Sequence, residues 1–176
     1  MDTKEKSRRG QTIIEAMIAL SVLTSGFLGI VALLSRSFFL NRVTSDSLTA
    51  TYLASEGIEL AKNLIDHDVY AHLAIPPQGA GWDTTFGAGG NYELDYATCT
   101  SGACIPTIFT GSTLKFDPAT GRYSYSGPNP TGFARLIRIT VPNANEIVVS
   151  SIVTWSTGIL TSQSIDLEDH FYNWRS

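Results

Sequence analysis

Glu15 is the residue of this chain whose surroundings most need a chemical explanation. It is the only charged residue between Gly10 and Arg36, and apolar residues dominate that stretch. A carboxylate within a membrane-spanning segment costs roughly 2.5–3.5 kcal/mol, so such a residue usually has a polar partner. The position of Glu15 therefore predicts a contact with another group that compensates its charge.

Other residues that could perform catalysis lack the required spacing. His67, flanked by two aspartates, could hold a metal together with His72, but the spacing matches no recognisable ligand set, and a solvated helix end is the simpler interpretation. The chain has no Gly-x-Ser-x-Gly nucleophile motif. The glycine-rich residues 87–90 lack the Lys and Ser or Thr of a phosphate-binding loop. We therefore expect no enzyme activity, no metal and no cofactor.

The charges are distributed unevenly along the 176 residues. The whole chain has twelve Lys or Arg and sixteen Asp or Glu, for a formal charge of -4. Residues 1–10 hold four basic and two acidic side chains, a net charge of +2, which leaves -6 for the remainder. The 43% of hydrophobic residues excludes a disordered chain, and the pI near 5.3 argues against a nucleic-acid binder. A basic start, an apolar run and an acidic remainder indicate a membrane-targeted chain.

Residues 12–34 form an apolar run of 23 residues. As a helix this run would span roughly 34 Å, enough to cross a bilayer core of about 30 Å. A cleaved signal peptide has a shorter apolar region of about 7–15 residues and then an Ala-x-Ala-like site, which the following SRSFFLNR does not offer. A plain single-pass anchor fits the length but leaves Glu15 unexplained. The basic residues before the run predict a cytoplasmic N-terminus and an exported remainder.

The residues from Arg8 to Leu20, RRGQTIIEAMIAL, resemble the N-terminus of a type IV prepilin or pseudopilin. In that family a short basic leader ends in Gly, Glu is the fifth residue of the mature chain, and an apolar helix follows. The resemblance implies that a prepilin peptidase cleaves between Gly10 and Gln11 on the cytoplasmic side and that Gln11 becomes N-methylated. Gln11 stands where the family usually has Phe or Met.

The resemblance also implies a role for Glu15. In an assembling filament of this family, the Glu of one subunit pairs with the N-terminal amine of its neighbour, which here belongs to Gln11. Such a pair relieves the cost of burying both charges and fixes the axial register between subunits. The alternative is a Glu15 side chain that only reaches the membrane interface. The implied partners are the prepilin peptidase, other pilin or pseudopilin subunits, the cytoplasmic membrane and assembly platform proteins.

The helical pattern continues beyond the apolar run. Two rows at i, i+4, i+7 and i+11 make one apolar stripe, composed of Leu53, Gly57, Leu60 and Leu64 and of Ala54, Ile58, Ala61 and Ile65. Residues 11–75 contain no Pro. We therefore expect one continuous helix from about Thr12 to about Leu64, whose second half packs on a globular head.

The head shows short strand patterns separated by turns. Residues 113–116 and 122–125 flank a turn that contains Pro and Gly, which predicts a hairpin. Residues 133–141, 146–155 and 159–167 are further strand candidates, and their short connections predict an antiparallel meander. Arg135 and Arg138 do not share one face of the first of these strands, so we expect one of them near a strand end or edge. We expect the aromatic tail, residues 170–174, to pack on the head.

Cys99 and Cys104 enclose a four-residue loop that contains Gly102. An exported chain meets oxidising conditions, and a loop this short can close, so the sequence predicts a disulfide that staples the loop. Two free thiols in a reducing habitat are the alternative.

These features together predict an α+β chain, a long N-terminal helix packed on a small antiparallel sheet. Residues 1–10 would be a leader, 11–34 a transmembrane or filament-core helix, 35–66 the amphipathic half of that helix, and 67–176 an exported β head. The expected function is that of a minor pilin or pseudopilin, held in the cytoplasmic membrane and then assembled into a surface or periplasmic filament. The alternatives are a major pilin, a single-pass membrane protein with a small extracytoplasmic binding head, and a secreted domain.

Overall fold

A computed structural model describes the backbone of residues 3–74, 81–96, 105–156 and 162–174, and the side chains of the helix from residue 12 to residue 71. The chain divides into two compact units, Met1–Thr44 and Ser45–Ser176. Cys99 and Cys104 lie outside the described residues, so the disulfide stays a prediction.

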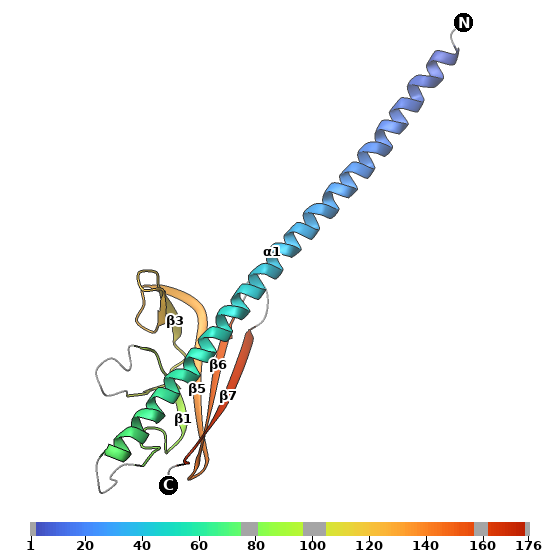
Figure 1. Cartoon of the computed structure of the whole chain (residues 1–176). Helices are drawn as coiled ribbons and strands as arrows, with labels where there is room; N and C mark the ends of the chain where they lie inside the picture. Colours follow the sequence, from blue (N-terminus) through green and yellow to red (C-terminus); the bar gives the residue numbers. More distant parts are fainter. Residues whose placement is uncertain (1–2, 75–80, 97–104, 157–161, 175–176) are drawn as a thin grey trace. The chain divides into compact units, whose positions relative to one another are not determined.

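A single helix, α1, runs from Thr3 to Ala74 (Figure 1). It extends further than the sequence predicted at both ends. At the C-terminal end the reason is that buried positions continue past Leu64 to Ile65 and Asp68. The first prolines of the chain, Pro76 and Pro77, follow directly, and a proline ring cannot continue a helix.

In the first unit, α1 presents its apolar side chains to the outside in every direction. All residues from 12 to 42 are exposed. The large apolar side chains from Ile13 to Leu40 keep between 41% and 71% of their surface accessible.

In the second unit, α1 buries one stripe of its surface. Ala50, Ala54, Gly57, Ala61 and Leu64 follow one another at intervals of three or four residues and are all buried. This spacing places them on one face of a helix. The amphipathic pattern read from the sequence is therefore the packing face of the helix.

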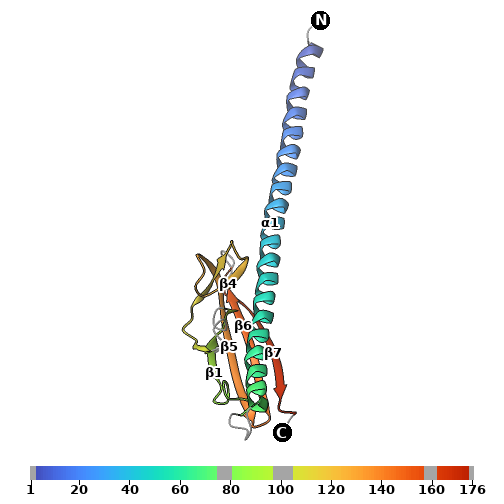
Figure 2. The ribbon, with the colours of Figure 1, turned by 60° about the vertical axis from the view of Figure 1, so that its left-hand side comes forward.

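The α+β fold class is confirmed, because this face packs on a seven-stranded antiparallel sheet (Figure 2). The strands are β1 (Gly90–Glu93), β2 (Thr107–Ile108), β3 (Thr113–Asp117), β4 (Arg122–Ser124), β5 (Asn129–Asn143), β6 (Glu146–Trp155) and β7 (Gln163–Tyr172). β5 is central: it pairs with β6 along one edge, and with both β1 and β3 along the other. β2, β4 and β7 pair with β1, β3 and β6 respectively.

The predicted hairpin is present as β3 and β4. Asp117 organises the turn between them, because its carboxylate accepts hydrogen bonds from the Ala119 amide and the Thr120 hydroxyl. Gly121 has a φ of 69°, and its amide donates to the Asp117 carbonyl over 2.8 Å. A left-handed conformation of this kind favours glycine.

The predicted meander is present as β5, β6 and β7, but the third strand lies further along the chain than expected. It occupies Gln163–Tyr172, with Trp155 opposite Gln163 and Glu146 opposite Tyr172. Most of the aromatic tail therefore belongs to β7. Phe171 packs against the core, whereas Trp174 is 76% exposed, so the tail packs on the head only in part.

Arg135 corrects the expectation that one of the two arginines lies at a strand end or edge. It occupies the middle of β5 and is fully buried, whereas Arg138 is exposed. The strand alternation explains this arrangement, because Arg135 shares the inward face of β5 with Ile137 and Ile139. Its neighbours on the helix supply the polar partners that a buried guanidinium needs.

Candidate functional site

Glu15 lies on α1 in the first unit, where its neighbours on the helix surface are Ile14, Ile18 and Ala19. It makes no hydrogen bond or ion pair with any residue that the structure describes. Gly10 and Gln11 belong to the same helix, but their side chains lie outside the described part of the chain. The structure therefore places the three predicted assembly residues on one helix.

The hydroxyl groups near Glu15 in the sequence are satisfied within the helix. The side chains of Ser21, Thr24, Ser25 and Ser35 donate to backbone carbonyls three or four residues earlier, over 2.8–3.0 Å. Hydrogen bonds of this kind let hydroxyl side chains sit in an apolar environment. Glu15 differs from them, because no hydrogen bond with a described residue compensates its charge.

The first half of α1 is apolar enough to cross a membrane. Its most apolar window of 18 residues has a mean hydropathy of 2.3, and none of that window is buried. This finding concerns length and composition, and it is compatible with anchoring of the chain in a membrane.

In the second unit, Arg135 joins the sheet to the helix. Its Nη1 donates to the Leu53 carbonyl and to Glu56 Oε2, each over 3.0 Å. Its Nη2 donates to the Leu94 carbonyl over 2.5 Å. We call this set of contacts the Arg135 clamp. We did not predict it from the sequence, although a positively charged residue at an inward position of an alternating strand is a pattern that could have indicated it.

Gly57 sits beside the clamp and allows the helix to approach the sheet. A Cβ at this position would lie 2.3 Å from Ser151 Oγ and 2.6 Å from Ile137 Cδ1. Both distances are shorter than a side chain tolerates. Gly57 therefore marks a close contact between α1 and the strands β5 and β6.

The buried carboxylates of Asp68 and Glu93 bind residues in the loops of the head. Asp68 accepts hydrogen bonds from the amide and hydroxyl of Thr85. Glu93 accepts from both groups of Thr110 and from the Ser112 amide. Burial raises the pKa of Glu93, but these hydrogen bonds outweigh it, so the pKa lies below the ordinary value. Both carboxylates are thus structural.

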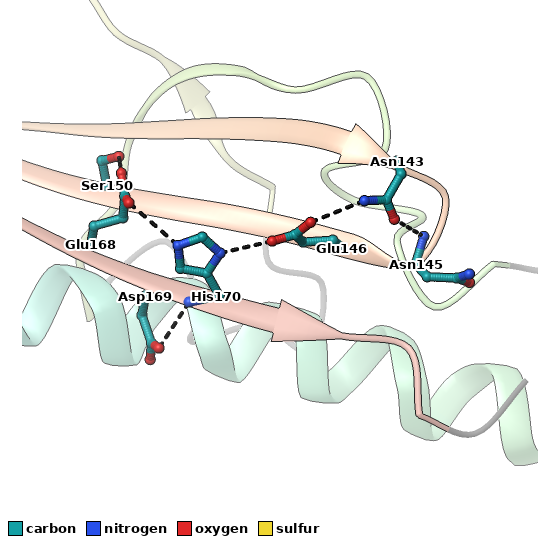
Figure 3. A network of polar contacts seen from close by, with 7 residues as sticks. All are labelled: Asn143, Asn145, Glu146, Ser150, Glu168, Asp169 and His170. Carbon is teal, nitrogen blue, oxygen red and sulfur yellow. Dashed lines mark hydrogen bonds and ion pairs between the residues drawn. The ribbon is translucent and has the colours of Figure 1, made fainter.

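His170 is the centre of an exposed polar network (Figure 3). Its Nδ1 lies 2.8 Å from Glu146 Oε1, and its Nε2 lies 3.4 Å from Glu168 Oε1. The hydrogen bond with Glu146 is the main cause that raises the pKa of His170, and the same contact lowers the pKa of Glu146. Because both ring nitrogens face carboxylates, the arrangement suits an imidazolium ion.

The described residues contain no group of three His, Cys, Asp or Glu side chains arranged to hold a metal ion. His67 Nδ1 lies 3.8 Å from Asp68 Oδ1, and the side chain of His72 lies outside the described range.

Comparison with protein-family models, with curated proteins and with solved structures gave no match. The residues described above define an α+β protein in which one long N-terminal helix, apolar in its first half, packs on an antiparallel sheet. This architecture is compatible with a pilin-like fold.

Proposed function

We propose that this chain is a filament subunit of the type IV pilin class, a minor pilin or a pseudopilin. The observation that carries the proposal is the exposed apolar run of residues 12–34, in which Glu15 has no partner among the described residues. Apolar surface on this scale is covered by lipid or by other chains in a functional protein. Before assembly the cover would be the cytoplasmic membrane, and in the filament it would be the same segment of neighbouring subunits.

The partner proposed for Glu15 is the N-terminal amine of a neighbouring subunit. Cleavage after Gly10 by a prepilin peptidase would create that amine on Gln11. In an environment of low dielectric constant, two opposite charges attract strongly and each lowers the cost of burying the other. Glu15 would therefore favour the axial position of the neighbouring subunit at which the N-terminal amine of that subunit can pair with the carboxylate.

The proposed role of the head is to remain outside the membrane and face outward from the filament. The buried clamp of Arg135 ties the head to the helix, so a force on the helix reaches the sheet directly. In this proposal the chain is a substrate of the peptidase and not itself an enzyme, and its partners are other subunits and assembly platform proteins.

The test is a Glu15→Val variant, expressed beside tagged wild-type chain in cells that have a prepilin peptidase and a pilus or secretion filament. Membrane insertion should persist, because the variant removes a charge from the apolar segment. Incorporation into sheared filaments should fall strongly, because the pair with the amine is lost. Thr24→Val is the matched control, since it removes a polar group that is already satisfied by Ser21.

The same experiment also distinguishes the filament proposal from its main alternative. A single-pass membrane protein with a binding head would insert in the membrane but enter no filament, with or without Glu15. Incorporation of Glu15→Val at the level of the wild type would remove the proposed role of this residue.

A further inference from the structure

A groove of about 430 Å³ lies in the second unit, between the last turns of α1 and the end of β7. Ile65, Val69 and Phe171 contribute apolar surface to it, and Trp82, which is 8% exposed, also lines it. A volume of this size falls within the range of about 300–1,000 Å³ typical of small-ligand sites. Nothing in the filament proposal uses this groove.

Exposed aromatic side chains also line the groove. Tyr70 is 72% exposed and Trp174 is 76% exposed, and both line it. The Trp82 indole N–H already donates to the Ala144 carbonyl over 3.1 Å. Trp82 therefore offers its ring, and not a hydrogen-bond donor, to whatever enters the groove.

Asp66 supplies the charge. It lines the groove, is exposed, and makes no hydrogen bond or ion pair with any described residue. His170 also lines the groove, but both of its ring nitrogens are directed at Glu146 and Glu168. No Lys or Arg is among the described residues that line the site. Asp66 is thus the one carboxylate among the described residues that line the groove, and aromatic rings belong to the same lining.

We propose that this groove binds an organic ammonium group, a quaternary or primary amine on a small apolar body. Aromatic faces attract cations through the ring quadrupole, and a carboxylate adds a direct charge interaction. A sugar would need several hydrogen-bonding side chains around its hydroxyls, and an anion would be repelled by Asp66. The apolar walls from Ile65 and Val69 fit the carbon substituents of an alkylammonium ion.

The experiment titrates the full chain in micelles of a non-ionic detergent with choline or tetramethylammonium, and in parallel with 3,3-dimethylbutanol, the uncharged isostere of choline. Nα-acetyl-lysine methylamide tests whether the ammonium group can be that of a lysine side chain. Tryptophan fluorescence and NMR chemical shifts report binding, because Trp82 and Trp174 line the site. We expect the cations to bind at least about tenfold more tightly than the isostere.

Variants locate the site. Asp66→Asn should weaken cation binding by about tenfold, and Trp174→Ala, at an exposed position, should weaken it further without unfolding the head. Asp166→Asn removes an exposed carboxylate of β7 that does not line the groove, and it should leave binding unchanged.

Equal binding of choline and its isostere, or cation binding in Asp66→Asn that is as tight as in the wild type, would overturn the proposal. Binding of neutral sugars in place of cations would overturn it as well. None of these results bears on filament assembly, which depends on the first unit.

Discussion

Arg135 Nη1 and Glu56 Oε2 lie 3.0 Å apart and join the middle of the central strand to the long helix. The two side chains differ in environment, since the Arg135 side chain is fully buried and that of Glu56 is 37% exposed. The same guanidinium also donates to the carbonyls of Leu53 and Leu94. One buried cation of β5 thus contacts both the helix and the segment after β1.

Replacing Arg135 should destabilise the head much more than replacing Glu56. Arg135→Met removes the donor to two buried carbonyls and should lower the free energy of unfolding by about 2–4 kcal/mol. Glu56→Gln keeps an acceptor at a partly exposed position and should cost less than about 1 kcal/mol. Chemical denaturation followed by tryptophan fluorescence measures both, because all three tryptophans lie in the second unit. Equal losses from the two variants would refute the clamp.

A side chain at Gly57 should push the helix away from the sheet. Gly57→Ala would place a Cβ 2.3 Å from Ser151 Oγ, and overpacking of this kind costs about 1–3 kcal/mol. Gly132→Ala is the matched control, because a Cβ there meets nothing within 4 Å. Thermal unfolding of the two variants side by side measures the difference. A Gly57→Ala head as stable as the wild type would show that the contact is loose.

The His170 network should make the stability of the head depend on pH. His170 has a pKa above its ordinary value of 6.5, so its contribution is complete below that pH and is lost as the pH rises through the folded-state pKa. Glu146 has a pKa below its ordinary value of 4.5, so its contribution is present above that pH and is lost as the pH falls through the folded-state pKa. The network should therefore stabilise the head most between about pH 4.5 and 6.5.

NMR titration of the histidine rings measures the pKa of His170 directly. Glu146→Gln should return the pKa of His170 towards its ordinary value, because the hydrogen bond with Glu146 is the main cause of the shift. Ser164→Ala, on the same strand but outside the network, is the control. A pKa of His170 that does not respond to Glu146→Gln would contradict the geometry of Figure 3.

Local patterns predicted much of this fold from the sequence. The stripe of Leu53, Ala54, Ala61 and Leu64 is the packing face of the helix, and the turn around Gly121 closes the predicted hairpin. These features depend on helix periodicity and turn chemistry, which neighbouring residues determine.

Features that depend on distant parts of the chain were not predictable in the same way. The partners of Arg135 lie 41 to 82 residues away in the sequence, so alternation alone could not reveal which groups its guanidinium would meet in the core. The sequence pattern places the third strand of the meander too early, because the bounds of β7 follow from its pairing with β6 and not from its own apolar content. The partner of Glu15 belongs to another chain in our proposal, and no single chain can display it.

The mature N-terminus tests the central claim most directly. Intact mass spectrometry should compare chains from cells with an active and an inactive prepilin peptidase, and Gly10→Val should remain uncleaved as the control. We predict a chain that begins at Gln11 and carries one added methyl group when the peptidase is active. A mature chain that begins at Met1, or near residue 36 after the apolar segment, would contradict the proposed function.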